Sequence, residues 1–135
     1  AAQRADIVGI NGTLEAGVIG PEAIATMTEA AVVDKLAIVA DAAAAAGRLD
    51  HIEMNIRTFF VSVTEDREQR IADTAALISV DPEMVAASPF ALIGTASQIA
   101  EQLVERRERF GFSYVIVGAD EVDDFSPVVA QLAGT

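Results

Sequence analysis

The stretch Arg107-Glu-Arg-Phe-Gly-Phe-Ser-Tyr-Val-Ile-Val117 decides the fold class of this 135-residue chain. Its first residues complete an amphipathic helix, and Gly111 is the kind of residue that commonly ends one. Residues 113–118 are almost continuously apolar, which is typical of a parallel strand covered on both faces. The stretch therefore indicates a helix-to-strand unit of an α/β protein.

The same kind of unit recurs upstream. Residues 6–10 form a second apolar run, and residues 51–63 a third, longer one. The predicted helices between and after these strands begin at capping or proline signals, namely Thr26 with Glu29, Thr64, Asp81-Pro82, Thr95 with Gln98, and Ser126-Pro127. The order β-α-β-α-α-α-β-α predicts three parallel strands joined by right-handed crossovers.

Three parallel strands leave two open edges and usually need helices on both faces. The first residues, Ala1 to Asp6, read as the last turn of a helix entered in its middle. An irregular loop through Gly17, Gly20 and Pro21 is expected after the first strand. We therefore expect residues 1–135 to be a single portion of a larger parallel α/β domain whose N-terminal strands are absent.

Composition narrows the function classes. The net charge of -12 disfavours nucleic acid and anionic membranes as partners, because both are bound through basic residues. Cysteine is absent, and no apolar stretch approaches the roughly 20 residues of a membrane span, so a cytoplasmic protein is expected. His51 is the only histidine, and the acidic turn at residues 120–124 lacks the glycine and distal glutamate of a calcium loop. No metal site is predicted.

Ligands of α/β proteins bind beyond the carboxyl ends of the strands. Asn11 follows the first predicted strand and Asp120 the third, so each is either a ligand contact or part of a structural loop. Gly94 and Thr95 open a helix, whose free N–H groups either meet a phosphate or are simply capped.

Polar residues also alternate along the start of the second strand. Glu53, Asn55 and Arg57 share one face of it. In a barrel these side chains would point into the lumen. The alternatives are an internal Glu53–Arg57 pair or a solvent-exposed face.

Four segments of the chain are similar to one protein family: residues 4–11, residues 93–95 with the helix that follows, residues 107–117 and residues 125–134. They resemble the luciferase-like monooxygenase family, and more narrowly its deazaflavin (coenzyme F420) dependent oxidoreductases. The resemblance covers nearly the whole chain but only the C-terminal part of the family. It implies the last three β/α units of a TIM-type (β/α)8 barrel, and thus a partial barrel.

The resemblance also implies a function. It implies hydride transfer between coenzyme F420 or FMN and a small organic substrate, with Asn11, Gly94 and Thr95 on the cofactor side and Arg57 and Asp120 on the substrate-side rim. The isolated chain is expected to bind no cofactor and to be inactive, because most of the pocket is missing. Its expected partner is the N-terminal half of the barrel or a second copy in a homo-oligomer. The alternative is a non-catalytic, self-associating module that binds or supports another molecule.

Overall fold

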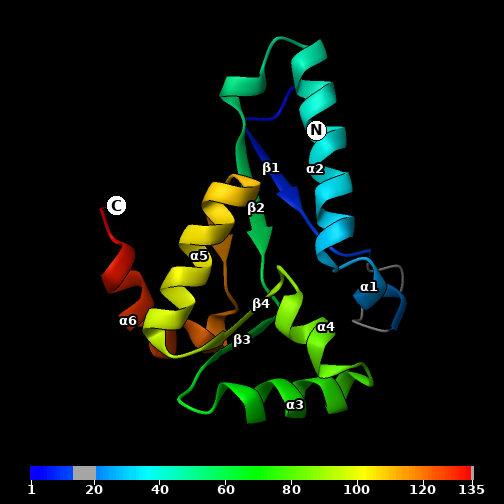
Figure 1. The fold of residues 1–135 in the computed structure, drawn as a ribbon. Coiled ribbons are helices and arrows are strands. Elements are labelled where there is room, and N and C mark those ends of the chain that lie inside the picture. The colour runs from blue at the N-terminus through cyan, green and yellow to red at the C-terminus, as the bar shows by residue number, and fades with distance from the viewer. Residues whose placement is uncertain (14–20, 135) are drawn as a thin grey trace.

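The computed structural model describes residues 1–13 and 21–134 of the chain (Figure 1). Gly17 and Gly20 of the expected loop lie outside these residues, whereas Pro21, expected in the same loop, is instead the first residue of a short helix. The strands are β1 (Ile7–Ile10), β2 (Glu53–Arg57), β3 (Phe60–Val63), β4 (Ala91–Gly94) and β5 (Phe112–Ile116). The helices are α1 (Pro21–Ala25), α2 (Glu29–Ala45), η1 (Leu49–His51), α3 (Arg67–Ile78), α4 (Pro82–Ala87), α5 (Ala96–Phe110), η2 (Ala119–Glu121) and α6 (Val122–Leu132).

The strands form two small parallel sheets. The first has the order β1-β2-β5, and the second pairs β3 with β4. Ile10 lies opposite Ile56, which in turn lies opposite Val115, so these three side chains share one face of the first sheet. The predicted α/β class with parallel strands is confirmed, whereas the described residues do not close a barrel.

The prediction of a single strand over residues 51–63 was wrong, because the chain changes partners in the middle. The amide N and the hydroxyl of Thr58 both donate to the carbonyl of Ile116, which belongs to β5. The next amide, that of Phe59, donates instead to the carbonyl of Phe90. Residues 91–94 then supply β4 as the partner of β3, a strand that the sequence reading did not count.

Several helix starts also differ from the predictions. Thr28, not Thr26, caps α2, because the Thr26 hydroxyl is used by the amide of Thr13 and the carbonyl of Ala23. Asp66, not Thr64, caps α3. Helix α6 begins at Val122 and contains Pro127, which was expected near its start.

Other local predictions are confirmed. Thr95 and Gln98 form the full reciprocal capping box of α5, and Gly111 ends that helix with a positive φ of 76°. Pro82 opens α4, which Asp81 precedes. The amide of Ala5 donates to the carbonyl of Ala1, so the chain does begin with a helical turn.

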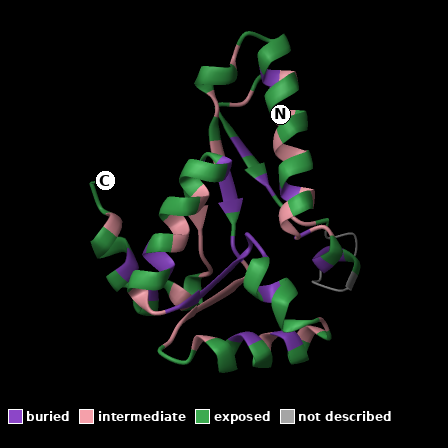
Figure 2. Ribbon diagram, in the orientation of Figure 1, coloured by how far each residue is buried: buried purple, intermediate pink, exposed green. Residues whose placement is uncertain are grey.

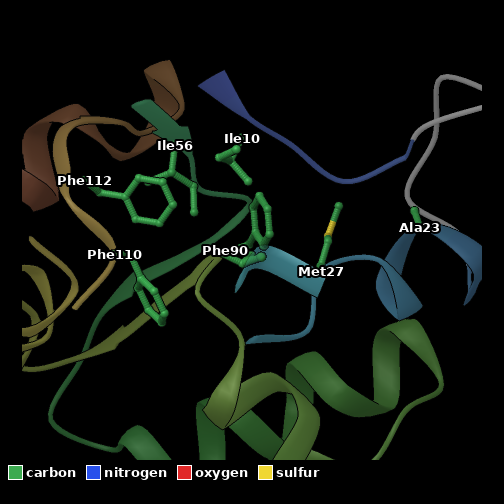
Figure 3. Close-up of a cluster of buried hydrophobic side chains, with 8 residues drawn as sticks. Ile10, Ala23, Met27, Ile56, Phe90, Phe110 and Phe112 are labelled. Carbon is green, nitrogen blue, oxygen red and sulfur yellow. The ribbon is translucent and has the colours of Figure 1, made fainter. Parts of the chain in front are cut away.

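The main hydrophobic core lies on one face of the first sheet. Ile10, Ile56 and Phe112 project from its three strands toward Phe90, which is completely buried (Figure 3). Val32 of α2 packs into the same cluster. Helix α2 and the α5–α6 pair thus cover the same side of this sheet, since Val115 of β5 also packs against the α5–α6 cluster.

The second sheet is covered on both faces. Ala91 and Ile93 of β4 pack against α3 and α4, whereas Leu92 packs against α5 and α6. Figure 2 accordingly shows β4 buried over its length. Of the helices in the described ranges, none combines the length and the apolar character that crossing a bilayer requires.

Candidate functional site: an open sheet face and its carboxyl edge

The face of the first sheet that points away from the helices is open to solvent. Ile7 is 49% exposed on β1, and Tyr114 is 44% exposed on β5. Between them, Glu53 and Arg57 of β2 are also exposed. The alternation of polar residues in β2 therefore does mark an uncovered face, and the polar side chains and the core side chains point in opposite directions from the strand.

Hydrogen bonds order the centre of this open face. The side-chain amide of Asn55 donates to the carbonyl of Tyr114 at 3.0 Å. The same side chain crosses over Gly9, where an added Cβ would stand 3.1 Å from Asn55 Oδ1. Glycine on β1 thus gives Asn55 room to lie flat between the strands, and this explains why an asparagine facing away from the core is nevertheless buried.

The two charged residues of β2 do not pair with each other in the described part of the chain. Glu53 accepts a hydrogen bond from the Ser113 hydroxyl at 3.1 Å. The guanidinium carbon of Arg57 lies 5.4 Å from the centre of the Phe59 ring. Four strand residues span ~13 Å, so the two charges sit near opposite ends of the face. The internal ion pair was a wrong alternative.

Asn11 and Arg57 lie at one edge of this sheet, because the parallel strands β1 and β2 end there. Lys35 of α2 fixes the chain beyond β1, donating to the carbonyls of Asn11 at 2.7 Å and Thr26 at 3.0 Å. Partial burial lowers the pKa of Lys35. The Asn11 side chain accepts a hydrogen bond from the amide of Gly12 at 2.8 Å, and Asn11 is exposed.

The segment after β5 reaches the same edge and holds a residue that sequence reasoning missed. Asp120, the predicted rim residue, is exposed. Its neighbour Glu121 turns its carboxylate back over Gly118, where a Cβ would collide with it. Glu121 Oε2 is shielded from solvent and has no hydrogen-bond partner among the described residues. In the sequence Glu121 is one of several acidic residues between positions 120 and 124, and no signal distinguishes it from the others.

Gly94 and Thr95 lie elsewhere, because Gly94 is the last residue of β4 in the second sheet and Thr95 follows it. The amide of Thr95 donates to Gln98 Oε1 at 2.9 Å, and the amide of Gln98 donates to the Thr95 hydroxyl at 3.2 Å. These two N–H groups are therefore already satisfied within the helix. The structure thus brings Asn11, Arg57 and Asp120 to one sheet edge and leaves Gly94 and Thr95 on another sheet.

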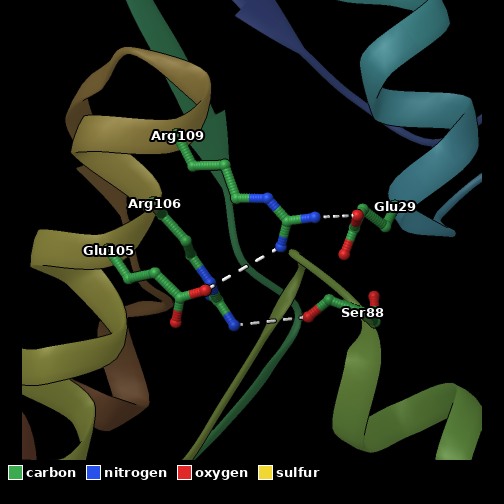
Figure 4. A network of polar contacts seen from close by, with 5 residues as sticks. All are labelled: Glu29, Ser88, Glu105, Arg106 and Arg109. Carbon is green, nitrogen blue, oxygen red and sulfur yellow. Dashed lines mark hydrogen bonds and ion pairs between the residues drawn. The ribbon is translucent and has the colours of Figure 1, made fainter.

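Arg106 of α5 is held against the chain around the core. Its guanidinium donates to the carbonyls of Ser88, Pro89 and Ala91, at 3.4, 3.0 and 2.6 Å. Burial lowers the pKa of Arg106 to about 10, so it stays charged at neutral pH. Arg109, one turn further, pairs with Glu29 of α2 (Figure 4). Both arginines fasten α5 to the segments around the core.

An apolar groove of about 350 Å³ lies on the helix side, between α5, β5 and α6. Leu103, Val128 and Leu132 are among its lining residues, as are Arg107 and Ser113. None of the predicted site residues lines it. Within the described ranges, the acidic side chains do not gather into a group of three that a metal ion would need.

Comparison with protein-family models, with curated proteins and with solved structures finds no match to this chain.

Proposed function

We propose that this chain forms one wall of a flavin- or coenzyme F420-dependent oxidoreductase of the luciferase-like type, which transfers hydride to or from a small organic substrate. The observation that carries the proposal is the shared edge of three adjacent parallel strands, where Asn11 follows β1, Arg57 ends β2, and Asp120 lies beyond β5. Ligands of α/β proteins bind at such carboxyl edges. The open polar face beside this edge suits the inner wall of a barrel.

The residues at this edge suit a flavin or deazaflavin only in part. The exposed amide of Asn11 and guanidinium of Arg57 are donors for a phosphate or a ring carbonyl. The buried acceptor Glu121 Oε2 lacks a donor, which a hydroxyl of the cofactor's sugar-like chain would supply. The capping box, by contrast, already occupies the amides at Thr95 and Gln98, which weakens the assignment of Gly94 and Thr95 to a phosphate.

In this proposal the cofactor, when bound, supplies the hydride chemistry, and the chain supplies binding and orientation. Arg57 would hold negative charge at the mouth of the site, and its contact with the Phe59 ring would limit its movement. Asn11 would orient a polar group beside it. Lys35 would keep Asn11 in place through the Asn11 carbonyl. The remaining walls would come from further β/α units.

The proposal is tested by following the fluorescence of FMN and of coenzyme F420 during titration with protein. We expect no saturable binding by the chain alone. Co-expression with the five N-terminal β/α units of a luciferase-like oxidoreductase should restore binding, and Arg57→Ala should weaken it at least tenfold. Glu101→Gln, an exposed change on α5, is the matched control and should leave it unchanged. No binding by the combined form would refute the proposal.

A second candidate function is a non-catalytic, self-associating module. The observation that favours it is that the face formed by Ile7, Glu53, Arg57 and Tyr114 is exposed in a single copy of the chain. Neither β1 nor β5, the two outer strands, carries a charged residue or a proline to discourage pairing. Saturable cofactor binding that needs added β/α units would exclude this alternative.

A further inference from the structure

The open face of the β1-β2-β5 sheet has a charge pattern that is complementary to itself. Glu53 lies near one end of β2 and Arg57 near the other, with Asn55 midway between them. A two-fold axis through the middle of such a pattern places each charge opposite its counterpart in a second copy. The geometry points to one occupant of this face: we propose that a second copy of this chain packs on it with its strands antiparallel, so that Glu53 faces Arg57 of the second copy.

Charge selects this arrangement over the other face-to-face possibility. With the strands parallel, Glu53 would meet Glu53 of the second copy and Arg57 would meet Arg57, and like charges placed opposite each other are unfavourable. The antiparallel arrangement instead forms two opposite-charge contacts. Neither residue has a competing ion pair among the described residues. Glu53 accepts a hydrogen bond from the Ser113 hydroxyl, and Arg57 lies over the Phe59 ring.

Uncharged residues beside and between the two charges suit a packed interface. Tyr114 is large and half-exposed on β5, and Ile7 is half-exposed on β1. The Asn55 side chain lies flat against the sheet, and Gly9 adds no side chain. The centre of the face therefore carries no side chain that projects far from the sheet. Two such faces can approach to the roughly 10 Å spacing of stacked sheets, with the long side chains of Glu53 and Arg57 bridging the gap at the ends.

The interface is small, and this sets the expected strength. Three strands of about five residues present only ~240 Å² in projection, far less than the ~800 Å² that each partner buries in a standard interface. The overall net charge of -12 also makes copies repel one another. The dimer is therefore weak and forms reversibly at high protein concentration.

This inference does not depend on the redox proposal. In the dimer Arg57 is engaged by the second copy, so the self-associated chain is a form that does not present Arg57 to a ligand. Added β/α units that complete a barrel would compete for the same face. Dimerisation is measured without any cofactor, and thus its failure and the failure of cofactor binding are separate results.

Sedimentation velocity over a concentration series, with variants of the two charges, tests the inference. We expect the wild-type dimer to be weakened at least tenfold by either Glu53→Arg or Arg57→Glu. A mixture of these two variants should associate at least as well as wild type, and the double variant should recover. Glu101→Arg and Arg70→Glu make the same changes of charge on exposed helix positions and serve as matched controls.

The direction in which Glu53→Arg changes association distinguishes this interface from an effect of overall net charge. Glu53→Arg reduces the net negative charge, so nonspecific repulsion would fall and association would increase. The proposed interface predicts the opposite. A wild-type chain that stays monomeric at every concentration, or single variants that associate as strongly as wild type, would overturn the proposal. The second result would assign association to the outer edges of β1 and β5. Far-UV circular dichroism checks that each variant folds.

Discussion

The two sheets of this molecule differ in how they are covered. Strand β4 is buried along its whole length, with α3 and α4 on one side and α5 and α6 on the other. Strand β2 is covered on one side only, and its sequence alternates between core residues and Glu53, Asn55 and Arg57. The comparison shows that helices cover β4 on both sides, whereas the first sheet packs its core on one side and exposes a polar surface on the other.

The largest expected effect comes from a matched pair of substitutions that truncate aliphatic side chains, one in each sheet. Leu92→Ala empties a completely buried position in β4 and should lower the free energy of unfolding by about 3 kcal/mol. Ile7→Ala, on the open face, should lower it by less than about 0.5 kcal/mol. Urea denaturation measures both. Equal losses would show that the first sheet is covered as fully as the second.

The next test addresses the link between α5 and the doubly covered sheet. Arg106→Met removes the donor to the carbonyls of Ser88, Pro89 and Ala91 and should cost about 2 kcal/mol of stability. Arg106→Lys should recover part of this loss, because an ammonium group still donates hydrogen bonds. Arg70→Met, at an exposed position, is the control. If urea denaturation showed that Arg106→Met is as stable as the wild type, Arg106 would not be the link between α5 and the second sheet.

The smallest test concerns the open face itself. Asn55→Ala removes the hydrogen bond to the Tyr114 carbonyl and should lower the free energy of unfolding by about 1 kcal/mol. Glu53→Gln should change it by only a few tenths of a kcal/mol, because Glu53 is exposed. Thermal unfolding followed by circular dichroism compares the two. A neutral Asn55→Ala would show that the polar centre of this face contributes nothing to the sheet.

Local signals in the sequence predicted local structure well. The capping box at Thr95 and Gln98 and the glycine at 111 act through neighbouring backbone groups, so they set the bounds of α5 without help from the rest of the molecule. Thr26 shows the limit of such signals. Its spacing to Glu29 suggests a cap, but hydrogen bonds with Ala23 and with Thr13 use its hydroxyl instead.

Features that depend on contacts distant in sequence could not be predicted. The strand breaks at Thr58 because the amide of Thr58 bonds to the carbonyl of Ile116, whereas the next amide bonds to the carbonyl of Phe90. Nothing in residues 51–63 signals that change of partner. The burial of Arg106 likewise depends on backbone carbonyls that are distant in sequence. The burial of Glu121 Oε2 depends on its side chain folding back over Gly118. The alternation in β2 did indicate that one side of the strand is polar, because a strand's period of two separates its two faces. It left open whether that side faces a lumen or solvent.

The most direct test of the central claim is the solvent access of the two faces of the first sheet. The chain has no cysteine, so single-cysteine variants report without background. In dilute protein, Tyr114→Cys on the open face should react with a thiol reagent at nearly the rate of an unfolded peptide. Ile56→Cys, on the same sheet but facing the helices, should react at least a hundredfold more slowly. Similar rates at the two positions, or protection of both, would contradict the account.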